Sequence, residues 1–238
     1  MITNILNFKT MRKLLFLTPL FLIGCTISQK IVYKTDDLQA PQTVKPIPAK
    51  VEVRIFEDNR ANLEENAVLF NNPRQLKLNG KQTCINSEKH YKKDTVVNQL
   101  SKIMVDHFNK ARLFSMSFYK ESQYSNYYLT GTLNSFYAEQ EFSTGAAVGA
   151  SFGLVGALAT AGIKTPGKII IDISDLKLYK KDGTLVKDFG NFYKEYKEEF
   201  KADASCWCAY WNANLMLKDF NTYLIEKIRT DMTGVELE

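Results

Sequence analysis

The sequence predicts an α/β (α+β) domain in which two helices pack on a mixed sheet. Several short segments alternate apolar and polar residues, two longer segments repeat apolar residues every three or four positions, and turn signals separate them. The chain has 238 residues, of which 45% are hydrophobic and 24% charged. This length and composition allow one domain with a buried core and exclude disorder or a coiled coil for the whole chain.

Seven segments are predicted to be strands because apolar residues alternate in them and turn residues bound them. The first, Val51 to Ile55, alternates apolar residues with charges, and Asn79-Gly80 ends the second. Asp182-Gly183 lies between two of the later strands and predicts a hairpin. In chain order the strands cover residues 51–55, 75–78, 114–119, 127–136, 169–179, 184–189 and 192–200.

Two segments have the apolar spacing of an amphipathic helix. The first begins at a capping residue, Asp94 or Thr95, and runs to Ala111. The second runs from about Asn212 to Asp231 after the last strand. Each segment has one apolar face, so both helices are predicted to pack on the sheet.

The N-terminal residues predict export. The basic pair Arg12-Lys13 precedes an apolar run, Leu14 to Ile23, which is too short to cross a bilayer core of about 30 Å and is typical of a signal peptide. Leu22-Ile23-Gly24-Cys25 resembles the bacterial lipobox. The resemblance implies that residues 1–24 are removed and that Cys25 carries a diacylglycerol and an acyl chain such as palmitate. The absence of Asp after Cys25 predicts the outer membrane, by the sorting rule of enteric bacteria.

The rest of the chain divides into a tether and a domain. Residues 25–49 are polar, contain three prolines and show no periodicity, so they are predicted to form an extended tether. Residues 50–238 are predicted to form a single domain. The formal net charge of +5 includes three basic residues and no acid from the leader, so the mature chain is nearly neutral. This charge argues against nucleic acid as a partner.

One insertion has an unusual composition. Residues 142–163 read FSTGAAVGASFGLVGALATAGI and contain no charged side chain. On one helix, Gly145, Gly149, Gly153 and Gly156 would form a ridge along which another backbone can approach closely, as in the glycine zippers of membrane helices. Three interpretations remain open: a helix that associates with membrane or with other copies, a mobile loop, and a buried helix.

The order of these elements resembles a broad group of bacterial lipoproteins. The segments VEVRIFEDNR, NYYLTGTLNSF and KIIIDISDLKLYKKDGTLV, with the glycine-rich insertion between the last two, are similar in style to CsgG secretion lipoproteins, YajG-type lipoproteins and TraT surface-exclusion lipoproteins. The resemblance implies a homo-oligomer or a larger envelope assembly. TraT-type chains carry a longer insertion, and one crossing would put the flanking strands on opposite sides of the membrane. The insertion must therefore break near Gly153 or Gly156 as a re-entrant hairpin, or pack without crossing.

Three cysteines remain besides Cys25. In an oxidising compartment they predict one disulfide, from Cys84 to Cys206 or Cys208, with a remaining thiol able to link two subunits. A zinc site from these cysteines and His90 would have an atypical C-x-C spacing, so no metal is predicted. Trp207, Tyr210 and Trp211 are expected to pack near the disulfide, with interfacial anchoring as the alternative.

The one match to a catalytic motif lacks the partner residues that the motif needs. Residues 149–153 satisfy G-x-S-x-G around Ser151, but both histidines, His90 and His107, precede the serine, whereas the nucleophile elbow needs a histidine after it. Asp58 and Arg60 are interpreted as a turn with an ion pair. No catalytic residue and no cofactor other than the covalent lipid is predicted.

These observations predict a non-enzymatic envelope lipoprotein with its domain in the periplasm. Its anchor is Cys25, its partner is the lipid bilayer, and its role is structural, in assembly or in secretion. The alternative function is that of an auxiliary lipoprotein that binds lipid for an envelope transport system. That alternative predicts an apolar pocket between sheet and helix, and a monomer.

Overall fold

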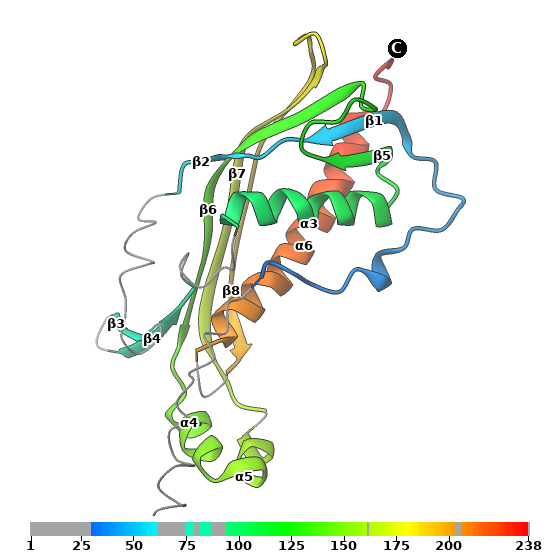
Figure 1. The fold of residues 1–238 in the computed structure, drawn as a ribbon. Coiled ribbons are helices and arrows are strands. Elements are labelled where there is room, and N and C mark those ends of the chain that lie inside the picture. The colour runs from blue at the N-terminus through cyan, green and yellow to red at the C-terminus, as the bar shows by residue number, and fades with distance from the viewer. Residues whose placement is uncertain are drawn as a thin grey trace, which may run out of the picture.

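The computed structural model describes residues 30–60, 75–78, 81–86, 94–160, 162–202 and 206–237. These residues form one mixed sheet with two long helices on one face, which confirms the α+β class (Figure 1). Cys25 and the predicted signal peptide, residues 1–24, lie outside the described residues.

The described sheet contains strands of very different length. They are β1 (Ile47–Val53), β2 (Glu57–Asp58), β3 (Gln75–Leu78), β4 (Lys81–Ile85), β5 (Phe114–Tyr119), β6 (Tyr127–Glu141), β7 (Lys164–Lys180) and β8 (Leu185–Lys201). The helical elements are η2 (Asp36–Leu38), α3 (Val96–Lys110), α4 (Thr144–Ser151), α5 (Gly153–Thr160) and α6 (Cys208–Asp231).

The long strand β6 organises the sheet. One of its edges pairs antiparallel with β7, which pairs antiparallel with β8. Three segments share its other edge in turn: β1 and β2 run parallel to β6, and β4 runs antiparallel to it. The strand β5 extends the sheet beyond β1, and β3 pairs with β4.

The structure corrects several strand boundaries. β8 is one strand, whereas the sequence predicted two, over residues 184–189 and 192–200. Gly190 lies at the expected break with φ +74°, and the β7–β8 register shifts nearby, so the glycine marks a bulge and not an end. β6 and β7 are also longer than predicted, and β4 was not predicted at all.

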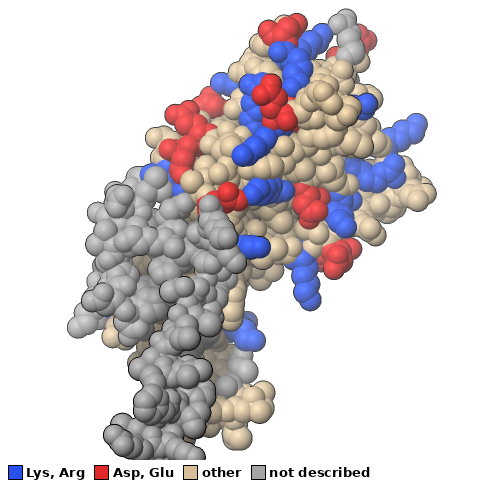
Figure 2. Space-filling model, in the orientation of Figure 1, with Lys and Arg blue, Asp and Glu red and all other residues tan. Residues whose placement is uncertain are grey.

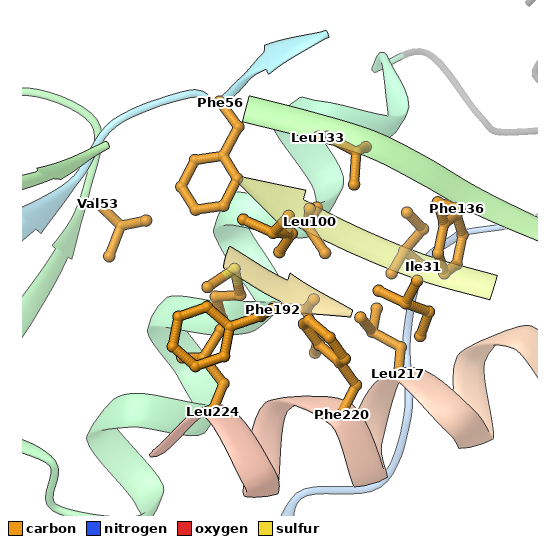
Figure 3. Packing of buried hydrophobic residues seen from close by; sticks show 14 of the residues in the cluster. Ile31, Val53, Phe56, Leu100, Leu133, Phe136, Phe192, Leu217, Phe220 and Leu224 are labelled. Carbon is orange, nitrogen blue, oxygen red and sulfur yellow. The ribbon is translucent and has the colours of Figure 1, made fainter. Parts of the chain in front are cut away.

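The two long helices cover the same face of the sheet and build the core. Thr95 caps α3 as predicted, because its side chain accepts a hydrogen bond from the Asn98 backbone. The buried side chains of both helices meet those of the strands between the layers (Figure 3). Burial of one such Leu or Phe stabilises the fold by roughly 1.5 to 3 kcal/mol. The labelled members of this core include Leu100 of α3, Leu217, Phe220 and Leu224 of α6, and Leu133, Phe136 and Phe192 of the sheet.

Residues 30–46, which we call the strap, lie against the domain. The sequence predicted an extended tether over residues 25–49, but Ile31 is buried and its backbone N–H donates to Oε1 of Gln99 on α3 (2.8 Å). The hydroxyl of Tyr33 lies 2.8 Å from Nδ1 of His107 and accepts from Nδ2 of Asn221 (2.6 Å). Ile31 and Tyr33 thus help to dock the strap on α3 and α6, and two isolated residues have no periodicity to reveal this contact.

Candidate functional site

The glycine-rich insertion forms a helical hairpin, residues 144–160, at one end of the molecule (Figure 1). Ser143 caps α4 by accepting from the Ala146 backbone (3.0 Å), and Gly153, with φ +71°, begins the return helix α5. Each arm has eight residues and is therefore about 12 Å long, less than half of a bilayer core. Because the chain returns, β6 and β7 stay on the same side of the hairpin.

The glycines have different positions from those predicted. The sequence suggested one ridge on a single helix, which is wrong because the segment breaks at Gly153. Gly149 and Gly156 instead face each other across the two arms, where a Cβ on Gly149 would lie 2.9 Å from the Gly156 carbonyl oxygen. Gly145 lies near the hairpin base, beside Ile163. The close backbone approach that glycine permits is therefore made within this chain.

The outer surface of the hairpin is apolar. Five of its large side chains are 58 to 79% exposed, and no charged residue occurs from residue 142 to 163. The part of the hairpin that is visible at the bottom of the space-filling view is tan, and blue atoms of Lys or Arg lie above it (Figure 2). A contiguous exposed apolar surface of this kind is typical of a contact site. The five residues are Val148, Phe152, Leu154, Val155 and Leu158.

The polar side chains of the hairpin bond to its own backbone. Ser151 donates its hydroxyl to the Val148 carbonyl (2.6 Å), and Thr160 donates to the Gly156 carbonyl (3.0 Å). Ser151 is thus part of the hairpin, whereas His107 lies on α3 against Tyr33. His90 lies outside the described residues. The hairpin therefore presents mainly carbon atoms to its surroundings.

A buried glutamine fixes the base of the hairpin. The Nε2 atom of Gln140 donates to the carbonyl oxygens of Phe200 (2.9 Å) and Lys201 (3.1 Å) and to Oγ1 of Thr165 (3.0 Å). Its Oε1 atom accepts from Nδ2 of Asn212 (2.8 Å). One side chain thereby joins β6, β7, β8 and α6 next to the base of the hairpin. Nothing in the sequence marks this residue, because a lone Gln belongs to no pattern.

A disulfide lies beside this glutamine. It joins Cys84 to Cys206, one of the two pairings that the sequence left open, and Cys84 is the register partner of Gln140. Two of the suggested zinc ligands are consequently engaged in the disulfide. Cys208 is buried at 3% exposure, which places its thiol out of reach of a second subunit. Tyr210 is buried nearby, whereas Trp211 is 56% exposed.

Charged residues lie at the boundary between the hairpin and the domain. Lys164 and Lys201 are register partners at the first position of the β7–β8 ladder, and both are exposed. Across β6, Lys81 pairs with Glu141 (2.5 Å). Among the described residues, Lys164 and Lys201 have no carboxylate within 4 Å.

The alternative function requires an apolar pocket between the sheet and the helices. Among the described residues, buried core side chains occupy this space (Figure 3). A depression of about 660 Å³ lies instead on the other face of the sheet, with charged groups such as Glu139, Lys168 and Lys197 in its wall. A polar, open depression does not suit an acyl chain.

The remaining polar candidates are structural or lie apart. Arg60 binds Asp58 through two hydrogen bonds of 2.8 and 2.7 Å, which confirms the predicted ion pair, but Asp58 lies in strand β2 and not in the predicted turn. The described ranges hold no group of three or more His, Cys, Asp or Glu side chains able to bind a metal. Within those same ranges, no helix combines the length and the apolar character needed to cross a membrane.

Comparison with known proteins gives little further guidance. No family model matches the chain, and no curated protein matches it. Among solved structures, it is similar to the crystal structure of protein XCC0632 from Xanthomonas campestris, which carries the family designation DUF330. The TM-score is 0.43 and the sequence identity is 9%, over 82% of this chain and 94% of that chain.

Proposed function

We propose that this protein is a non-enzymatic lipoprotein of the bacterial envelope, anchored in the outer membrane by lipid on Cys25. It acts as a structural or assembly component, and the hairpin is its contact element. The observation that carries the proposal is the exposed, uncharged hairpin on a rigid base. Exposed apolar side chains of this number are unfavourable in water, so the hairpin is expected to work in contact with lipid or with other subunits.

The strap supports the proposal because it brings the anchor to the hairpin end. The Lys30 carbonyl accepts from Nδ2 of Asn214 (3.1 Å), two residues from the Asn212 that holds Gln140. The five residues from Cys25 to Lys30 span at most about 18 Å. Lipid on Cys25 and the apolar hairpin can therefore reach the same membrane surface.

The anchor is tested on the full chain expressed in an enteric bacterium. The expected result is an outer-membrane protein whose mass shows removal of residues 1–24 and acylation of Cys25. The variant Thr26→Asp is expected to shift the protein to the inner membrane, and Thr26→Ser is the matched control. A mature protein without attached lipid would overturn the anchoring.

The assembly role is tested by native mass in mild detergent. The parent is expected to form a discrete species larger than a monomer. The pair Leu154→Asp and Val155→Asp, which charges the hairpin, is expected to reduce it to monomer. Leu185→Asp is the control, because Leu185 is also an exposed apolar residue and lies at the other end of β8. Monomer for the parent, or an unchanged oligomer for the charged hairpin, would contradict the assembly role.

A further inference from the structure

Two exposed lysines at the hairpin base stand opposite each other, and neither makes an ion pair within the described residues. Lys164 and Lys201 are direct register partners in the antiparallel β7–β8 pair. Side chains in such positions lie about 4.5 to 5.5 Å apart at Cβ, and like charges there destabilise the sheet. We call these two residues the lysine rung.

Three other lysines of β7 and β8 pair with carboxylates. Lys168 lies 3.2 Å from Glu139, Lys194 lies 3.0 Å from Asp219, and Lys197 lies 2.8 Å from Glu195. Lys164 and Lys201, which lie nearest to the hairpin, are exposed and make no ion pair within the described residues. Their side chains are therefore available to an anion that approaches from outside.

The rung lies at the depth where a membrane presents anions. Lys164 is the first charged residue after the uncharged stretch 142–163. Lys201 accepts at its carbonyl from Nδ2 of Asn212 (3.2 Å), and the preceding Trp211 is 56% exposed. An apolar tip followed by Lys and Trp matches the order of acyl chains and headgroups in a bilayer. Arms of about 12 Å would enter one leaflet, and the lysine side chains can extend to the phosphates above.

We propose that the lysine rung binds the phosphate groups of anionic lipids in the leaflet that the hairpin enters. The inference rests on the proposed role of the hairpin as a membrane contact. In this arrangement the hairpin supplies apolar affinity and the rung supplies a preference for anionic lipid. Each lysine near an anionic surface contributes about a fivefold gain in binding, so together they contribute about 30-fold.

The test uses the mature-length chain with Cys25→Ser, so that attached lipid does not contribute. Binding is measured by flotation with vesicles of equal parts phosphatidylglycerol and phosphatidylcholine, and with vesicles of phosphatidylcholine alone. The parent is expected to prefer the anionic vesicles. Lys164→Gln with Lys201→Gln is expected to weaken binding to them about 30-fold and to leave binding to phosphatidylcholine unchanged.

Two controls define the charge effect. Lys45→Gln with Lys187→Gln removes the same charge away from the hairpin and is expected to bind like the parent. Lys164→Arg with Lys201→Arg keeps the charge and is expected to keep the preference. If the glutamine variant retains the full anionic preference, the lysine rung is not a lipid site. If inorganic phosphate competes at a concentration far below that of the lipid, the site is one for free phosphate and the proposal fails.

A second pair of variants separates this inference from the proposed function. Phe152→Asp with Val155→Asp is expected to abolish binding to both vesicle types, while Leu185→Asp binds like the parent. If the charged hairpin loses binding and the glutamine variant of the lysine rung binds like the parent, the lipid site at the rung is rejected and the membrane role of the hairpin is kept. Parent-like binding of the charged hairpin, or no binding by the parent, would reject the membrane role of the hairpin as well. Circular dichroism confirms that each variant is folded.

Discussion

Gly149 and Gly156 face each other so closely that neither position has room for a side chain. A Cβ on Gly156 would overlap the carbonyl group of Gly149, and one on Gly149 would approach the Gly156 carbonyl oxygen to 2.9 Å. These contacts hold the two arms of the hairpin against each other. The arms themselves are too short to be stable helices in isolation, so their packing decides whether the hairpin forms.

Gly156→Leu is therefore expected to separate the arms and leave the domain intact. Amide hydrogen exchange over residues 144–160 should become fast, while the melting temperature of the domain stays within about 2 °C, because the hairpin lies outside the main core. Gly162→Leu is the matched control, since a Cβ at Gly162 meets nothing within 4 Å. Equal exchange rates in both variants would show that the glycine contact does not hold the hairpin.

Glu52 is expected to stabilise the fold above its pKa. Burial alone would raise the pKa of this carboxyl, but hydrogen bonds from Lys181, the Ser122 backbone and Ser125 outweigh burial and hold the pKa below its usual range. Glu52→Gln should lower the free energy of unfolding by about 2 kcal/mol at neutral pH, because Lys181 loses its partner. The exposed Glu57→Gln should change it by less than about 0.5 kcal/mol.

The pH dependence of this effect has a definite sign. A lowered pKa means that the unfolded state binds the proton first, so the contribution is complete above about pH 4.3 and is lost as pH falls through the lower pKa of the folded state. Urea unfolding of the parent and Glu52→Gln at a series of pH values should show their difference closing in acid. A constant difference down to pH 2 would contradict the lowered pKa.

His107 should make stability depend on pH in a different window. Burial, and then the charge of Lys218, lower the pKa of His107 from 6.5 to about 4. The folded protein therefore holds a neutral ring where the unfolded chain is protonated. The free energy of unfolding should fall from pH 6.5 to pH 4 and level off below that range. His107→Gln should remove this slope, and an identical slope in the variant would assign it to another group.

Reduction of the disulfide is expected to be costly. Cys84 and Cys206 are 122 residues apart, and the chain-entropy model gives about 4 to 5 kcal/mol for a loop of this length. Cys206→Ser should lower the free energy of unfolding by this amount in urea, and a reducing agent should then have no further effect on stability. Cys208→Ala is the control, and its effect should be about 1 kcal/mol because a small buried side chain is replaced by another.

Most of the domain follows from patterns that the sequence displays. The strands β3 and β5 begin and end where alternation and turn residues predicted, and Thr95 begins α3 as its capping side chain indicated. These features depend on near neighbours in the chain. β4 was missed because its two pairings, with β3 and with β6, decide it. The break predicted between residues 189 and 192 is wrong because local sequence does not distinguish a bulge, here at Gly190, from the end of a strand.

Only part of the candidate site could be predicted from the sequence. Composition marked residues 142–163, and the position of the flanking strands left two possibilities: a re-entrant hairpin that breaks near Gly153 or Gly156, or a segment that packs against membrane or partner without crossing. The structure has a hairpin with its break at Gly153. The pairing of Gly149 with Gly156 depends on where the helix breaks, which the spacing of glycines does not determine. The lysine rung depends on register across two strands, since Lys164 and Lys201 are far apart in sequence. Gln140 acts through four partners on three other elements, and no sequence pattern reports such a residue.

The docked strap reduces the maximal distance between Cys25 and the folded domain. With an extended tether from residue 25 to 49, the domain could lie up to about 75 Å from Cys25. With the strap docked, the five residues from Cys25 to Lys30 span at most about 18 Å. In the proposed lipid-anchored protein, this short connection would keep the hairpin at an effective concentration in the millimolar range next to the bilayer. A hairpin with only millimolar affinity for lipid would then be bound about half of the time. Release of Tyr33 and Ile31 from α3 and α6 would lower this effective concentration, so in that arrangement the strap would set how often the hairpin contacts the membrane without a change in the hairpin itself.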